Sequence, residues 1–286
     1  MSSDASVLAV NGSIYTFVFG DTVFSVDAAK AGRVVRFSLG GKNILTAAKS
    51  AADNNWGSTF WPSPQSDWNW PPPAEIDPGA YRAQARGASV LLTSPTAPGL
   101  GLSVSKRYSV DRDNGAIDIE YGLVNKGDKP RSVAPWEITR VAAGGLTFFP
   151  MGEGAPTKGP QELLRLQILD GVAWFAYDAR AVSSDQKVFA DGYEGWIAHA
   201  AGDLLLVKAF ADTLPAQAAP GEAEIEIYTD AGKSYIEVEN QGAYVSLAPG
   251  AATMWRVRWL LRKLPASVSL RPGSVNLLGI ARALVM

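Results

Sequence analysis

A hairpin pattern decides the fold class of this 286-residue chain: Leu102-Ser-Val-Ser-Lys-Arg-Tyr-Ser-Val110, then Asp111-Arg-Asp-Asn-Gly115, then Ala116-Ile-Asp-Ile-Glu-Tyr-Gly-Leu-Val124. In the last run the apolar residues Ile117, Ile119 and Tyr121 alternate with the acidic residues Asp118 and Glu120. Successive side chains of a strand point to opposite faces, so a period of two indicates a strand with one buried face. Asn-Gly between two such runs is a strong turn signal. We therefore expect an antiparallel hairpin here.

Similar runs continue along the chain in both directions, separated by Gly-, Pro- and Asn-containing turns. Further strands are expected at 14–19, 23–26, 32–39, 81–86, 89–93, 132–141, 172–177, 194–200, 204–210, 223–228, 235–240, 244–247 and 254–264. Gln161–Leu169 is the one helix candidate in the body of the chain. The tail, residues 264–286, is expected to pack on the body as an edge segment or short helix. These patterns predict an all-β sandwich in which residues 1–286 form a single domain.

The composition excludes several classes of protein. A net charge of −2, with 47% hydrophobic and 19% charged residues, is typical of a soluble globular chain and does not indicate a nucleic-acid partner. No apolar run is long enough to span a membrane. The absence of cysteine rules out disulfides and thiolate metal sites, and the single histidine, His199, rules out multi-histidine metal centres. We therefore identify no metal site and no cofactor, although carboxylate oxygens of a site could still hold a divalent cation.

Two properties stay open at this stage. Residues 1–6 lack the pattern of a secretory signal, so a periplasmic or secreted location would require that a leader had been removed. The composition does not indicate an oligomeric state.

The segment Asp53–Pro73 holds four of the nine tryptophans and five prolines, and we expect an ordered but irregular loop. Long aromatic loops in compact domains are usually functional. Indole faces can pack on the C–H faces of a sugar while amide groups bond its hydroxyls. The alternative is that the indoles bury one another as a satellite core. The residues expected to bind a saccharide here are Asn55, Trp56, Trp61, Gln65, Trp68 and Trp70.

A second polar cluster lies in Tyr235-Ile-Glu-Val-Glu-Asn-Gln241. In a strand, Tyr235, Glu237 and Glu239 share one face. Two neighbouring carboxylates in a partly buried site would raise one pKa, as a general acid or base requires. The alternative is a solvated strand face, which antiparallel sheets commonly have.

Glu137 lies among apolar residues in Ala134–Arg140, where a buried carboxylate needs a partner. By alternation, Trp136 and Arg140 share the face opposite Glu137. The alternatives for Glu137 are a site role and a structural ion pair with an arginine of a neighbouring strand. Two more candidates are polar residues in apolar strands, each either structural or in contact with a ligand: His199 and Lys208.

Several segments, in this order, resemble the galactose mutarotase-like superfamily, and within it the bacterial branch known as DUF4380. The matching segments are 31–41, 57–65 with 68–72, 117–130, and 235–239 with 247–250. The tryptophan segment resembles the signature of that branch. The resemblance implies a large antiparallel supersandwich and a saccharide ligand.

Mutarotases use a histidine as general acid at the sugar ring oxygen and a glutamate as base at the anomeric hydroxyl. The resemblance implies that Glu239 corresponds to that glutamate, whereas the position most like the histidine holds Glu137. His199 lies in a later strand and does not match. We therefore hypothesise a catalytic Glu137–Glu239 pair that faces across a cleft, with Glu237, Arg140, His199 and Lys208 contacting the ligand.

Three functions are compatible with the sequence. The first is a carbohydrate-active enzyme, epimerase-like or else a glycoside hydrolase or polysaccharide lyase. The second is a sugar-binding protein without turnover. The third is an interaction protein whose indoles are core. The missing histidine argues against a standard aldose epimerase.

Overall fold

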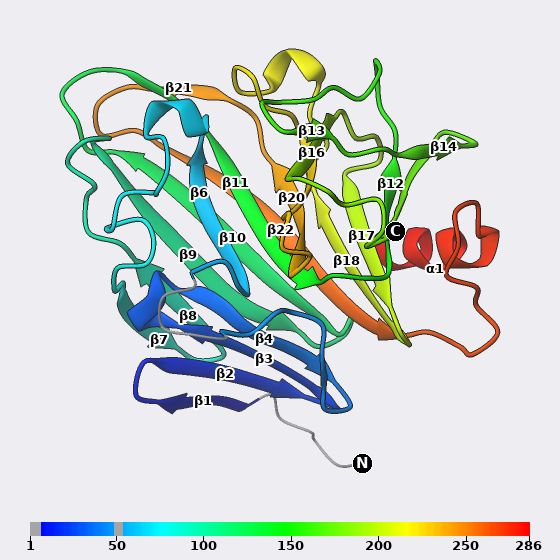
Figure 1. Ribbon diagram of the computed structural model, residues 1–286. Helices are drawn as coiled ribbons and strands as arrows, with labels where there is room; N and C mark the ends of the chain where they lie inside the picture. Colours follow the sequence, from blue (N-terminus) through cyan, green and yellow to red (C-terminus); the bar gives the residue numbers. More distant parts are fainter. Residues whose placement is uncertain (1–6, 49–53) are drawn as a thin grey trace.

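The structure, a computed structural model, describes residues 7–48 and 54–286. Two large, twisted β-sheets face each other, as Figure 1 shows. Within the described residues, every strand pairing is antiparallel except the one between β13 and β16. The predicted all-β sandwich is confirmed.

The first sheet has the strand order β1 (Val7–Asn11), β2 (Ile14–Phe19), β3 (Thr22–Asp27), β4 (Arg33–Leu39), β6 (Ser58–Ser63), β11 (Arg131–Ala142), β20 (Tyr235–Gln241), β19 (Ile225–Thr229), β16 (Gln186–Ala190) and β13 (Glu162–Leu163). Two short strands lie off this path: β5 (Lys42–Asn43) pairs with β4, and β21 (Val245–Leu247) pairs with β11.

The second sheet has the order β14 (Gln167–Leu169), β15 (Val172–Ala176), β12 (Leu146–Pro150), β17 (Trp196–Ala201), β18 (Leu204–Phe210), β22 (Ala252–Lys263), β10 (Ala116–Asn125), β9 (Leu102–Asp111), β8 (Ser89–Thr93) and β7 (Arg82–Arg86). The expected hairpin is β9–β10, in which Asp111 pairs with Ala116 across the turn.

Three single-turn 3-10 helices lie in the connections: η1 (Ala28–Lys30), η2 (Gln65–Asp67) and η3 (Pro215–Gln217). The tail forms the α-helix α1 (Val275–Val285), one of the two outcomes expected for it. Its N-cap is Ser274, whose side chain accepts a hydrogen bond from the backbone N–H of Leu277. The helix covers an apolar cluster that includes Phe148, Trp174 and Trp196. Within 7–48 and 54–286, no helix is long and apolar enough to cross a membrane.

The tryptophan segment is not wholly a loop, which corrects the expectation for 53–73: residues 58–63 form the buried strand β6. Residues 49–53, and so the first residue of this segment, lie outside the described chain. Pro62, one of the five prolines on which that expectation rests, lies inside this strand. Beyond Ser58, β6 pairs only with β11, and its other edge makes no backbone hydrogen bonds to a neighbouring strand. A strand with such an unpaired edge tolerates proline, which has no N–H to donate.

The helix expected over Gln161–Leu169 is also wrong. This stretch instead forms the short strands β13 and β14, which pair with β16 and β15 at the edges of the two sheets. Free sheet edges offer the backbone hydrogen bonds that a helix would otherwise supply. Tertiary pairing thus overrides the local helical preference.

A buried ion pair ties the two sheets together. Glu137 on β11 points into the space between the sheets, and its Oε1 lies 2.9 Å from Nζ of Lys208 on β18. Both side chains are fully buried. The carboxylate also accepts hydrogen bonds from the Tyr121 hydroxyl (2.6 Å) and Trp259 Nε1 (3.0 Å) of the second sheet. Glu137 therefore has the geometry of the structural alternative, with a lysine rather than an arginine as its partner.

We predict that Glu137→Gln lowers the free energy of unfolding by about 3–5 kcal/mol, because it leaves the Lys208 ammonium uncompensated in the core. Adding Lys208→Met in the same chain should recover most of that loss. Urea unfolding of the two single variants and the double variant measures the coupling. Strictly additive losses, or a loss below about 1 kcal/mol for Glu137→Gln, would contradict this role.

Candidate functional site

The outer face of the first sheet carries a pocket of about 310 Å³. Its wall combines aromatic rings, amides and charged groups of both signs, which is the mixture expected of a small-molecule site. The lining residues are Asn55, Trp61, Gln65, Trp70, Trp136, Arg140, Gln161, Asp185, Lys187, Tyr228, Tyr235 and Glu237.

One row of directly paired residues crosses four strands on this face. Arg140 on β11 pairs with Glu237 on β20, Glu237 pairs with Tyr228 on β19, and Tyr228 pairs with Lys187 on β16. Residues directly opposite each other in an antiparallel sheet share a face. All four side chains therefore meet the same pocket.

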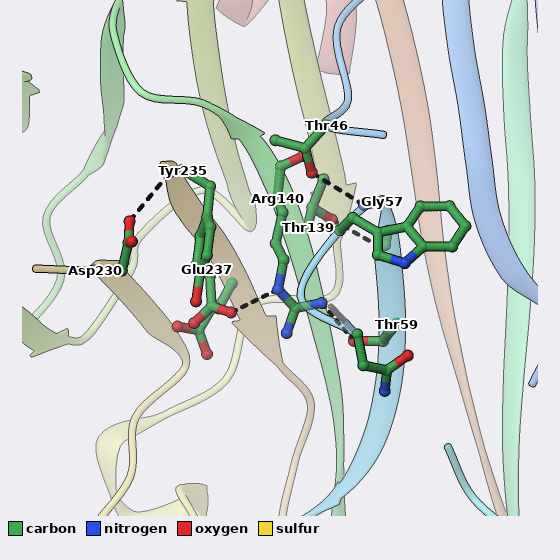
Figure 2. Close-up of polar contacts among 12 residues, drawn as sticks. Thr46, Gly57, Thr59, Thr139, Arg140, Asp230, Tyr235 and Glu237 are labelled. Atoms are coloured by element: carbon green, nitrogen blue, oxygen red, sulfur yellow. Dashed lines mark hydrogen bonds and ion pairs between the residues drawn. The ribbon is translucent and has the colours of Figure 1, made fainter. Parts of the chain in front are cut away.

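Arg140 connects three strands at one side of the pocket (Figure 2). Its Nε donates to Oε1 of Glu237 at 2.8 Å, and its Nη1 donates to the Thr59 hydroxyl at 3.3 Å. Its Nη2 is buried and has no hydrogen-bond partner among the described residues. The guanidinium carbon also lies 5.4 Å from the ring centre of Trp61 and 6.0 Å from that of Tyr235.

A second row lies beside the first and is acidic. Glu226 on β19 pairs directly with Glu239 on β20, and both are fully buried. Lys187 contacts both: its Nζ lies 2.6 Å from Glu226 Oε2 and 3.2 Å from Glu239 Oε1. Burial raises the pKa of Glu239 to about 7 and raises that of Glu226 as well, while the two carboxylates raise the pKa of Lys187 despite its burial.

The third row supplies the indoles. Trp61 on β6 pairs with Trp136 on β11, and their rings meet edge to face at 5.3 Å. Both nitrogens donate to buried carboxylates, Trp61 Nε1 to Asp77 at 3.0 Å and Trp136 Nε1 to Glu239 at 2.8 Å. Trp70 packs against Trp61 at 5.6 Å but remains 53% exposed. Trp70 is thus the indole with the most free surface at this pocket.

Glu222 holds the turn that carries Gln65 into the pocket. Its carboxylate accepts hydrogen bonds from the Gln65 backbone N–H at 2.6 Å and from the Ser63 hydroxyl. It also accepts from Gln241 Nε2 at 2.7 Å, and the same nitrogen donates to Glu226 at 2.8 Å. The turn after β6 is therefore linked to the acidic row below the pocket.

Half of the residues predicted from sequence line this pocket: Asn55, Trp61, Gln65, Trp70, Arg140 and Glu237. The predicted shared face of Tyr235, Glu237 and Glu239 is confirmed by the pairing of β20 with β11 and β19. Glu239 lies behind the wall and reaches the pocket through Lys187 and Trp136.

The hypothesis that Glu137 and Glu239 face each other across a cleft is wrong. Glu137 pairs with Asn240 and Ile138 pairs with Glu239, so the two carboxylates lie on opposite faces of the sheet. The alternation that sets Trp136 and Arg140 opposite Glu137 is confirmed by the same register.

Four other candidates lie outside the pocket. His199 is buried, and its Nδ1 lies 2.9 Å from the Thr147 hydroxyl; burial lowers its pKa to about 4, because the charged form is poorly solvated there. Lys208 pairs with Glu137 between the sheets. Trp56 is buried beneath the guanidinium of Arg33. Trp68 packs on the core, and its Nε1 donates to the Pro62 carbonyl.

Several pocket residues were not predicted: Trp136, Gln161, Asp185, Lys187, Tyr228 and Tyr235 as lining residues, and Glu226 beneath them. A signal for Glu226 exists, because it and Glu239 lie at similar distances from the turn at 230–233, and a hairpin pairs such positions. No comparable signal exists for Lys187, whose strand joins the site through long connections.

A larger hollow of about 750 Å³ lies on the second sheet. Its charged groups already pair with one another, as in Arg258–Asp118 at 2.8 Å and Arg256–Glu120 at 3.1 Å. It has the character of an ion-paired strand surface, so the smaller pocket is the better candidate site. Among the described residues, no group of three or more His, Asp or Glu side chains is arranged to hold a metal ion.

Known structures share this fold. A galactose mutarotase-like protein from Lactobacillus casei aligns with a TM-score of 0.64 and 12% identity, over 87% of this chain and 100% of that one. The protein Slr1438 from Synechocystis aligns with a TM-score of 0.60 and 12% identity, over 92% and 100%. Galactose 1-epimerase from Lactobacillus acidophilus aligns with a TM-score of 0.52 and 13% identity, over 91% and 99%.

At these identities the likeness establishes the galactose mutarotase-like fold alone. No curated protein sequence matches the chain. The family model described as a domain of unknown function, DUF4380, matches residues 24–262. The chain therefore belongs to the DUF4380 family and has the galactose mutarotase-like fold.

Proposed function

We propose that the pocket on the outer face of the first sheet binds a saccharide. The observation that carries this proposal is the lining itself: indole and phenol rings stand beside amides, two carboxylates, an arginine and a lysine around a pocket of about 310 Å³. Apolar ring faces suit the C–H faces of a sugar, and the polar groups suit its hydroxyls. Mutarotase-like and galactose epimerase neighbours of the same fold support a sugar ligand.

The free groups of the pocket indicate how a saccharide would be held. Trp70 is the exposed indole, so it provides the stacking surface. Arg140 Nη2 provides a donor without a partner, and an unpaired buried donor favours a ligand oxygen. The faces of Trp61 and Trp136 are less available, because Arg140 and Lys187 lie over them at 5.4 and 5.0 Å. Those two indoles would shape the pocket instead.

We predict that Trp70→Ala weakens saccharide binding about tenfold or more, because it removes the main stacking surface. The loss of stability should be small, since the side chain is 53% exposed. Tyr193→Ala is the control: this aromatic side chain is 63% exposed but lies outside the pocket, so the change should leave both the affinity and the melting temperature nearly unchanged.

A saccharide panel screened by glycan array and then by calorimetry provides the measurement. The proposal fails if the parent protein binds no member of a broad panel of monosaccharides and oligosaccharides. It also fails if Trp70→Ala binds as tightly as the parent, or if Tyr193→Ala weakens binding as much as Trp70→Ala does.

A second candidate function is turnover of that saccharide by acid/base chemistry, epimerase-like in type. The observation that favours it is the carboxyl pair beneath the pocket, in which the pKa of Glu239 is raised to about 7. A group with such a pKa can exchange protons near neutral pH. Glu237, which lines the pocket and accepts from Arg140 Nε, is placed to receive a proton from a ligand hydroxyl.

If the protein interconverts anomers, Glu237→Gln and Glu239→Gln should each lower the rate by about 100-fold or more, the usual contribution of a positioned acid or base. Glu120→Gln, on the outer face of the other sheet, is the control and should leave the rate unchanged. Saturation-transfer NMR of the anomeric protons measures the rate. Full activity in both pocket variants would exclude this chemistry.

A further inference from the structure

Two glutamates and one lysine form a buried cluster whose charges do not balance. Glu226 and Glu239 lie directly opposite each other on β19 and β20, and both have fully buried side chains. Like charges at directly opposite positions destabilise a sheet. Lys187 supplies one positive charge to the pair, through contacts of 2.6 and 3.2 Å. One negative charge remains without a cation.

In the part of the chain that the structure describes, the charged neighbours of the cluster do not supply the missing cation. Glu222 approaches from the segment before β19, bridged to Glu226 by Gln241, and adds negative charge. Glu237, the neighbour of Glu239 along β20, is also negative.

Among the described residues that line the pocket, the one cation besides Lys187 is already engaged. Arg140 is ion-paired with Glu237 at 2.8 Å. Trp136 is uncharged and uses its Nε1 to donate to Glu239. Because an unpaired buried carboxylate is poorly solvated, the least costly way to remove the excess charge is to bind a proton.

We propose that the Glu226–Glu239 pair holds one proton at neutral pH and that Lys187 delivers it to the ligand in the pocket. Lys187 is the only member of the three that lines the pocket. In the transfer, an N–H bond of Lys187 breaks as an O–H bond forms on the ligand. In the same concerted step the carboxyl proton of the pair moves to Nζ, so the ammonium keeps its charge and both carboxylates are left ionised until water returns a proton.

This relay would fill the role of general acid that the absent histidine leaves open. The raised pKa of Lys187 makes its ammonium a weak acid alone. The neighbouring carboxyl, with a pKa of about 7, makes the combined transfer easier, because the ammonium never loses its charge. Delivery to a ligand rests on the proposed saccharide function, whereas the stored proton does not.

Infrared difference spectroscopy of the full chain at pH 7 tests the stored proton without any ligand. The carboxylic-acid C=O band should lose intensity equal to one carboxyl in Glu226→Gln and likewise in Glu239→Gln, because the remaining glutamate then ionises beside Lys187. The control Glu120→Gln should leave the band unchanged. An unaltered band in both pocket variants would overturn the proposal.

The pH dependence of stability is a second measurement, and it shows whether the variants fold. A carboxyl with a raised pKa binds its proton more tightly in the folded chain, so its contribution to stability is lost as pH rises from about 4.5 to 7. The free energy of unfolding of the parent, measured with urea, should therefore fall over this pH range relative to that of Glu239→Gln. If the unfolding free energies of the parent and of Glu239→Gln changed with pH in the same way, the proposed shared proton would be contradicted.

Delivery by Lys187 is tested with Lys187→Arg on a saccharide that the parent binds and converts. Arginine keeps the positive charge but cannot release a proton near neutral pH. We expect binding within a factor of about three and turnover lowered about 100-fold or more. Unchanged turnover would exclude the relay, and an absence of saccharide binding in the parent would instead refute the proposed function while leaving the infrared result valid.

Discussion

The antiparallel register of β16, β19, β20 and β11 is the constraint on which the site depends. That register sets Arg140 opposite Glu237 and Glu226 opposite Glu239, all on the outer face. A slip of one residue would turn every side chain to the other face of the sheet. Arg140 would then enter the apolar core and Glu137 would face solvent. The Glu137–Lys208 pair supports this register from inside, because a slip of one residue would turn Glu137 away from Lys208.

The two faces of these strands hold carboxylates in different chemical situations. Between the sheets, Glu137 has one lysine and two further donors, so its charge is balanced and its geometry is rigid. Under the pocket, two glutamates share one lysine and the charge is not balanced. Balanced buried pairs are structural, whereas an excess charge beside a cavity is where proton exchange is expected. A glutamate carboxylate therefore stabilises the fold on the inner face of the first sheet, whereas on the outer face we propose that it exchanges protons.

The sequence predicted the fold class because strand alternation and turn residues are local signals. The same alternation correctly separated Glu137 from Trp136 and Arg140, yet a resemblance to the mutarotase pair set Glu137 opposite Glu239. The resemblance indicated where Glu137 and Glu239 lie along the chain, but it did not indicate on which face of the sheet each side chain lies. Glu226 was missed although the turn at 230–233 pairs it with Glu239, and Lys187 could not be found, because its place depends on non-local strand order. The strand β6 was not predicted because it contains Pro62, and from sequence alone a proline at an unpaired strand edge cannot be distinguished from a proline in a loop.

We place the proposed saccharide site on the outer face of the first sheet, against the indoles of Trp61, Trp70 and Trp136. Fluorine NMR of protein labelled with 5-fluorotryptophan resolves this directly, once each of the nine resonances is assigned by single substitution. On titration with a bound saccharide, the resonances of Trp61, Trp70 and Trp136 should shift, while those of the buried Trp174, Trp196 and Trp259 stay in place. A shift confined to Trp255, at the hollow of the second sheet, would contradict the assignment of the site.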